Sequence, residues 1–149
     1  MAGVQNGLAL AVATLSAGSA LIDGIQSGLA ARGFDDVRPA HGFAFVRISA
    51  GGATAREIGD HLGVTKQAAS QLVDDLLAKG YVRREPHPTD ARARLITLTD
   101  RGWACTRAAE QAAEDVVRTW TATLGQRRVS ALLADLTRVA PLGPLRPVW

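Results

Sequence analysis

Side chains suited to recognising a ligand are concentrated in the middle of the chain. Gln67 and Gln71 are four residues apart, so a helix would place them on one face, one turn from each other. A glutamine amide pairs bidentately with the major-groove edge of adenine, and Lys66 beside them can reach guanine or a phosphate. Thr65 and Ser70 suit contacts to phosphate or thymine. The same residues also fit a solvated helix face, so the surrounding elements must decide between the two.

A second group of charged side chains lies further along the chain. An arginine at the tip of a β-hairpin, as we expect for Arg92, can enter a narrow minor groove of DNA. The nearby carboxylate of Asp90 can hold that guanidinium in one orientation. Arg83, Arg84 and Arg94 would add phosphate contacts. The alternative is a surface salt bridge between Asp90 and Arg92, contributing well under about 1 kcal/mol to stability.

Local signals place these residues on two short helices followed by a hairpin. Thr54 and Glu57 have the spacing of a capping box, which predicts a helix that Gly63 ends. Thr65 caps the next helix, which Gly80 ends. Two short helices joined by a glycine-containing turn are typical of a helix-turn-helix.

After the second of these helices the hydrophobic period changes from helical to alternating. Residues 81–85 and 95–98 read as strands, and residues 86–90 read as a turn because they contain two prolines. A helix-turn-helix followed by a β-hairpin is a winged helix. The sequence thus predicts a mainly α fold, an α+β winged helix-turn-helix with a two-stranded wing.

Helices flank this unit on both sides. Apolar residues recur at helical spacing over residues 4–33, 39–49, 100–124 and 129–139. The first of these helices contains Gly18, Gly24 and Gly28, which weaken an isolated helix by about 1 kcal/mol each relative to alanine. Close approach of another helix would account for them.

The first helix has no charged side chain before Asp23. A signal peptide would need Lys or Arg ahead of the apolar stretch, and there is none. A membrane span would need about 20 strongly apolar residues, whereas this stretch contains polar residues and glycines. We therefore expect a helix covered by protein, no membrane association and a cytoplasmic protein.

Composition favours one globular domain that binds an anionic partner. The chain has 149 residues, 47% of them hydrophobic and 21% charged, which excludes wholesale disorder. The net charge is +3. Residues 54–99 contain seven Lys or Arg against six Asp or Glu, a net charge of only +1. Binding to DNA would therefore depend on where the charges are placed.

Residues 53–102 resemble the MarR family of bacterial transcriptional regulators. His87 and Ala91 depart from the family pattern in the turn of the wing. The residues that fit the pattern are Ile58, Leu62, Gly63, Val64, Ser70, Leu72, Leu76, Gly80, Val82, Asp90, Arg92, Leu98 and Thr99.

The resemblance implies a homodimer formed by the first, fifth and sixth helices. The dimer would bind double-stranded DNA at a pseudo-palindromic operator, with the fourth helix in the major groove and the wing in the adjacent minor groove. Residues 1–50 and 100–149 would be the helical dimerisation region and residues 51–99 the DNA-binding lobe of a single compact domain. Many members repress nearby genes and release DNA when a small aromatic or phenolic effector binds.

In the family the effector often lies between the dimer helices and the DNA-binding lobe. Arg38, His41, Phe45 and Trp103 could line such a cleft, offering polar groups beside aromatic walls. The alternative is that Phe45 and Trp103 belong to the core and that Arg38 is a surface group.

Other chemistry has little support in the sequence. No glycine-rich phosphate loop and no G-x-S-x-G elbow is present, so we expect no enzyme and no cofactor. His41, His61 and His87 lie in three different elements without the spacing of a metal site. Cys105 is the single cysteine of the sequence, so an intramolecular disulfide is excluded, and we interpret Cys105 as a small buried residue. Two other functions stay open, a thiol-based redox sensor acting through Cys105 and a winged-helix interaction module that does not bind DNA.

Overall fold

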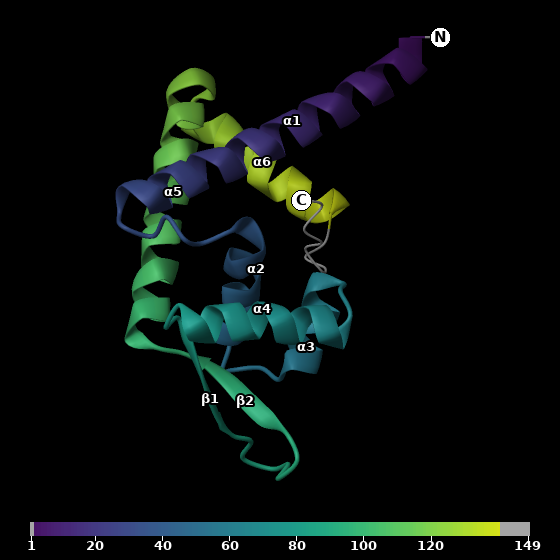
Figure 1. Ribbon diagram of the computed structural model, residues 1–149. Coiled ribbons are helices and arrows are strands. Elements are labelled where there is room, and N and C mark those ends of the chain that lie inside the picture. The colour runs from purple at the N-terminus through teal and green to yellow at the C-terminus, as the bar shows by residue number, and fades with distance from the viewer. Residues whose placement is uncertain (1, 141–149) are drawn as a thin grey trace.

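The computed structural model describes residues 2–140, and for residues 2–5 it describes the backbone alone. That part of the chain forms six helices and a two-stranded antiparallel hairpin, which confirms the predicted fold class (Figure 1). In chain order the elements are α1 (Ala2–Ala31), α2 (Pro39–Ser49), α3 (Ala55–Leu62), α4 (Lys66–Ala78), β1 (Val82–Pro86), β2 (Arg94–Leu98), α5 (Asp100–Leu124) and α6 (Gln126–Val139).

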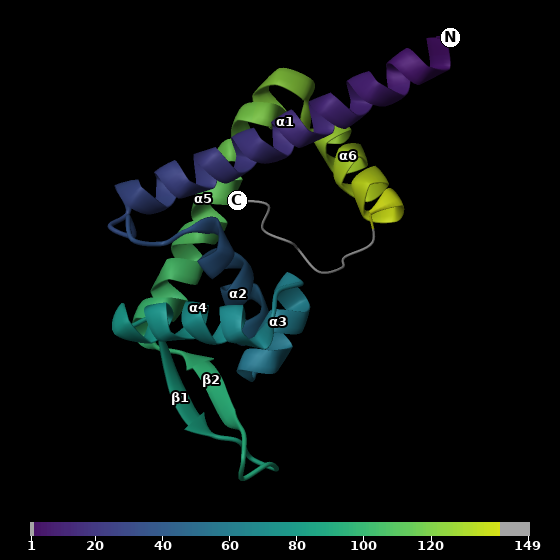
Figure 2. The same cartoon turned by 45° about the vertical axis from the view of Figure 1, so that its right-hand side comes forward.

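Helix α5 connects two regions of the molecule (Figure 1, Figure 2). α1 crosses α5, and α6 turns back from its C-terminal end. α2, α3, α4 and the hairpin gather around its N-terminal end, with the hairpin pointing away from α1. α2 was assigned by sequence to the dimerisation region, yet it packs against α3 and β2 as well as α5. The predicted division into a dimerisation region and a DNA-binding lobe stays a prediction. Residues 141–149 of the predicted dimerisation region lie outside the described part of the chain.

Glycines allow α1 to approach α5 closely. A Cβ atom on Gly24 would lie 2.5 Å from Cγ2 of Val116, and one on Gly28 would lie 2.5 Å from Cβ of Ala112. Both distances are too short for real atoms, so a side chain at either position would push the helices apart. Gly18 has nothing within 4 Å of its Cβ position. The expected close helix contact is therefore found at two of the three glycines.

The N-terminal half of α1 projects beyond the other elements (Figure 2). Leu8, Leu10, Val12 and Leu15 of this half are exposed, Leu15 at 75%. By length and composition alone, Asn6–Ala31 could cross a membrane, the one such helix in residues 2–140. A core helix of a soluble protein meets the same criterion.

The local signals for the helix-turn-helix operate as predicted. The amide of Thr54 donates to Glu57 Oε2 at 2.8 Å, and the amide of Glu57 donates to Thr54 Oγ1 at 3.2 Å. Gly63 ends α3 in the left-handed conformation with φ of 66°. Thr65 Oγ1 accepts from the amide of Ala68 at 3.1 Å and starts α4. These caps fix where both helices begin and end.

The hairpin is anchored to the body by its base. β1 and β2 pair from Val82 opposite Leu98 to Pro86 opposite Arg94. Ala53 adds an isolated bridge to Ile96. Both strands run slightly further toward the tip than predicted. Pro86 is tolerated because it stands at the last pairing position of β1, an edge strand of the two-stranded sheet.

Candidate nucleic-acid interface

One face of α4 is buried and the opposite face is exposed. Ala69, Val73 and Leu76 are buried in the core. Gln67 and Gln71 are exposed, and neither side chain has a hydrogen-bonding partner within the described residues. Lys66 and Thr65 are also exposed and Ser70 is partly so, although the hydroxyl of Thr65 already serves as the helix cap. The predicted contact residues of α4 therefore share one exposed surface.

Basic side chains converge on a groove beside that surface. The groove has a volume of about 430 Å³ and lies between the start of α3, α4 and the hairpin. Asp90 is the one acidic residue among those lining it. The basic residues that line it are Arg56, Lys66, Arg84, Arg92 and Arg94. Placement thus produces a positive surface although the lobe has almost no net charge.

The turn of the hairpin is held by two side chains that accept backbone hydrogen bonds. Asp90 Oδ1 accepts from the amide of Arg92 at 2.9 Å. His87 Nδ1 accepts from the amides of Thr89 and Asp90, both at 3.2 Å. The expected contact between the carboxylate and the Arg92 guanidinium is absent from residues 2–140, because Asp90 bonds to the backbone two residues on, as in an Asx turn. The guanidinium of Arg92 stays exposed at the turn.

The structure separates Arg83 from the other predicted arginines. Successive residues of a strand point to opposite faces, so Arg84 faces the groove and Arg83 faces away from it. Arg83 Nε contacts Glu85 Oε1 at 2.7 Å. Arg84 Nη2 contacts Asp74 Oδ1 of α4 at 2.6 Å. Arg83, Arg84 and Arg94 were all expected to contact phosphate, and of the three only Arg84 and Arg94 line this groove.

Arg56 was missed by sequence reasoning. It is exposed in the first turn of α3 and lines the groove opposite Arg92 and Arg94. The capping box that starts α3 did fix its position in the helix. Its nearness to the wing comes from the bridge between Ala53 and Ile96, which pairs residues far apart in the sequence.

Comparison with known proteins finds similarity to one family. The model of the MarR family matches residues 37–93. The multiple antibiotic resistance protein MarR of Salmonella typhimurium is 32% identical over 93 residues, which are 62% of this chain and 65% of that protein. MarR of Escherichia coli is 33% identical over 89 residues, 59% of this chain and 62% of that protein. The matched segments thus span just under two thirds of these relatives.

Solved structures agree over a greater length. Wild-type MarR from Escherichia coli in its apo form superposes with a TM-score of 0.72 at 25% identity, covering 89% of this chain and 97% of that one. A mutant of that protein complexed with operator DNA gives a TM-score of 0.73 at 25% identity, covering 91% and 96%. This chain is thus similar to the MarR family in sequence over residues 37–93 and in fold over about nine tenths of its length.

The four residues expected around an effector do not line one cavity. His41 is fully buried, and Phe45 is buried with its ring centroid 5.7 Å from that of Tyr81. Trp103 is 40% exposed and lies on the other face of the hairpin, near Arg83. Phe45 is thus a core residue, whereas Trp103 is not. The helical period of α2 places His41 and Phe45 on its inward face.

A different cavity lies between α1, α2 and α5. It has a volume of about 170 Å³, and Gln26 is the one polar residue among those lining it. The amide of Gln26 donates to the backbone oxygen of Val37 at 2.8 Å. The apolar lining is Ile22, Ile25, Leu29, Pro39, Gly42, Phe43, Val46 and Ala109.

Cys105 lies in the core and is 1% exposed. Burial raises the pKa of its thiol to about 11, so the reactive thiolate is scarce at neutral pH. Within residues 2–140 no group of three or more potential ligands is placed to hold a metal ion.

The buried imidazole of His41 makes stability dependent on pH. Burial, together with the charges of Arg38 and Lys79, lowers the pKa of His41 from 6.5 to about 4, against the opposing effect of Asp75. The unfolded chain therefore binds one more proton than the folded chain between pH 6.5 and about 4. We expect the free energy of unfolding to fall by up to about 3 kcal/mol as the pH is lowered through that window.

Urea unfolding at a series of pH values measures this effect. The hydrogen bond from Lys79 lowers the pKa of Asp75 from 3.8. Protonation of Asp75 therefore reduces the free energy of unfolding below pH 3.8, which is outside the pH window in which His41 acts. The variant His41→Gln has no titrating group at this position and should lose most of the slope. A free energy of unfolding that is equal at pH 6.5 and pH 4.5 would contradict the account.

Proposed function

We propose that this chain is a sequence-specific, dimeric DNA-binding regulator of transcription. The observation that carries the proposal is the groove lined by five basic residues beside the exposed glutamines of α4. A relative of similar fold was solved in complex with operator DNA, which supports the same partner here. The site acts by binding alone.

Each element of the surface has its own part in recognition. α4 enters the major groove, where Gln67 and Gln71 read base edges. The wing lies along the adjacent minor groove, and Arg92 at its turn enters the groove. Phosphates are bound by a further set of residues, Arg56, Thr65, Lys66, Ser70, Arg84 and Arg94.

We infer that the functional unit is a homodimer formed by α1, α5 and α6. These helices expose large apolar side chains, including Leu133 at 69% and Val139 at 79%. Apolar surface of this extent on three helices marks an interface with another protein. A two-fold dimer places two α4 helices on successive turns of DNA and so fits a pseudo-palindromic operator. A protein with this partner works in the cytoplasm.

Repression relieved by a small effector is the proposed regulatory output. We place the effector in the cavity between α1, α2 and α5, because the lining of this cavity is open and apolar. The cleft expected from the sequence had a different lining, namely Arg38, His41, Phe45 and Trp103. A small aromatic or phenolic molecule with one hydrogen-bond donor matches the cavity and its single amide, Gln26. The redox alternative finds no support in the buried thiol of Cys105.

Base reading and phosphate binding should separate in a salt titration. Gln71→Ala removes an uncharged base contact, so it should lower discrimination between selected and random DNA without changing the slope of log affinity against log salt. Arg94→Ala removes a phosphate contact, so it should weaken binding to both DNAs and flatten the slope by about 0.9 per subunit. The selected DNA is a duplex isolated from a random pool by the protein itself.

The control for that titration is Arg107→Ala, which removes an exposed arginine of α5 two turns from the wing. It should change neither discrimination nor slope. Equal loss of affinity by Gln71→Ala on both DNAs would show that α4 does not read bases. The absence of salt-dependent binding by the unmodified protein would favour the interaction module instead.

The dimer is tested by sedimentation velocity over a range of protein concentrations. An interface above about 2,000 Å², the size typical of obligate dimers, should keep the protein dimeric at micromolar concentration. Leu133→Glu places a charge in that interface and should produce monomers. Val46→Glu changes an apolar residue of α2 that is 56% exposed and should leave the dimer intact. A folded, monomeric unmodified protein at micromolar concentration would overturn the inference.

A further inference from the structure

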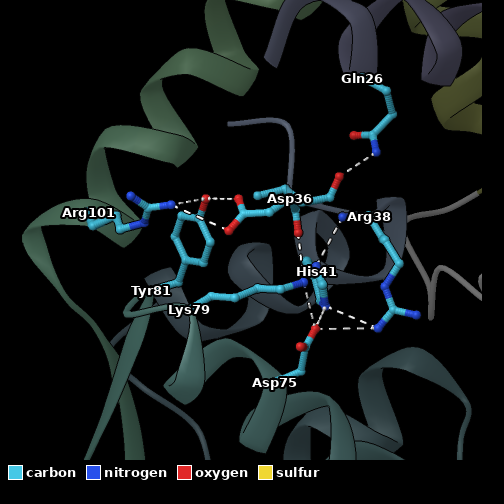
Figure 3. A network of polar contacts seen from close by, with 9 residues as sticks. Gln26, Asp36, Arg38, His41, Asp75, Lys79, Tyr81 and Arg101 are labelled. Carbon is cyan, nitrogen blue, oxygen red and sulfur yellow. Dashed lines mark hydrogen bonds and ion pairs between the residues drawn. The ribbon is translucent and has the colours of Figure 1, made fainter. Parts of the chain in front are cut away.

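The C-terminal half of α4 is held by polar contacts that lie away from its DNA-facing residues. Asp75, one turn after Gln71, has a side chain that is 35% exposed. Its Oδ2 atom accepts from His41 Nε2 at 2.9 Å and from Lys79 Nζ at 3.0 Å (Figure 3). Arg38 Nη2 lies 3.5 Å from the same oxygen. Two of these partners, His41 and Arg38, come from the start of α2.

His41 is fully buried, and both of its ring nitrogens are engaged. Nδ1 accepts from the backbone amide of Arg38 at 3.0 Å. An acceptor at Nδ1 places the hydrogen of the neutral ring on Nε2, which therefore donates to Asp75. The imidazole thus joins the first turn of α2 to α4 by two directional hydrogen bonds.

The same end of α4 is joined to the loop that follows α1. Lys79 Nζ donates to the backbone oxygen of Asp36 at 2.8 Å (Figure 3). The carboxylate of Asp36 accepts from the hydroxyl of Tyr81 at 2.5 Å and lies 3.4 Å from Arg101 Nη2. Arg101 also lies over the Tyr81 ring, 4.5 Å from its centroid. The loop, α2, α4 and α5 therefore meet in one polar network.

These contacts restrict rotation of α4 more finely than its apolar face does. Ala69, Val73 and Leu76 fix which face of α4 is buried, but apolar contacts carry little directional preference, so the polar contacts add the finer restraint on rotation of the helix about its axis. A hydrogen bond loses strength steeply with angle. The bond from His41 to Asp75 therefore fixes the rotation that determines where Gln67 and Gln71 point.

We propose that His41 is a positioning residue for base reading, which acts through Asp75 to set the orientation of α4 in the major groove. The proposal rests on the DNA-binding function proposed above. It gives His41 and Arg38 a role within the protein in place of the effector contacts expected from the sequence. It concerns discrimination between sequences, because the base-reading glutamines lie on α4, whereas Arg56, Arg84 and Arg94 bind phosphates from other elements.

The experiment measures affinity for selected and for random DNA at a temperature where circular dichroism shows every variant folded. His41→Leu removes both hydrogen bonds, and we expect it to lower the ratio of the two affinities about tenfold with the salt slope unchanged. His41→Gln keeps an amide N–H to donate to Asp75 and should restore most of the ratio. Phe45→Leu is the matched control, a core change one turn further along α2 that leaves the polar contacts in place.

A second variant keeps the test decisive if His41→Leu does not fold. Asp75→Ala removes the partner on α4, and the loss of its negative charge changes binding to both DNAs alike, so the ratio isolates positioning. The double variant should lose no more discrimination than either single variant. Equal losses of discrimination in Phe45→Leu and His41→Leu, or an unchanged ratio in both His41→Leu and Asp75→Ala, would overturn the proposal. If the unmodified protein bound no DNA, the proposed function itself would fail instead.

Discussion

The burial of one face of α4 determines where every DNA-facing side chain lies. Ala69, Val73 and Leu76 leave no space for water between α4 and the core, so the opposite face must be exposed. The wing depends on the same packing, because β1 leaves the end of α4 through Tyr81, a large and fully buried side chain. The polar network around Asp36 and Asp75 adds directional hydrogen bonds to this apolar contact.

The positive surface results from the pairing and orientation of charges. The lobe has nearly equal numbers of acidic and basic residues, yet five of its six acids are occupied by contacts within the protein. Asp74 is paired with Arg84, Glu57 with Arg47 and Asp75 with the His41 cluster. Five basic side chains remain around the groove, although Arg84 reaches it while paired to Asp74. Net charge is therefore a poor guide to the partner of this protein.

The sequence predicts this fold well wherever the cause is local. Capping at Thr54 and Thr65, the turn at Gly63 and the period of each helix depend on neighbouring residues, and all appear where expected. The side of the wing that Arg83 faces depends instead on strand register. The hydrogen bond that Asp90 accepts from the amide of Arg92 depends on the path of the turn. The contact from His41 to Asp75 joins residues 34 positions apart, which helical periodicity cannot reveal.

The most direct test of this account is dimethyl sulfate protection of DNA selected by the protein. The reagent methylates N7 of guanine in the major groove and N3 of adenine in the minor groove. Two α4 helices related by a dimer axis should protect major-groove positions in two patches about 10 bp apart, each adjoined by minor-groove protection from a wing. A single patch, or protection confined to the minor groove, would contradict the assignment of α4 as the base-reading element.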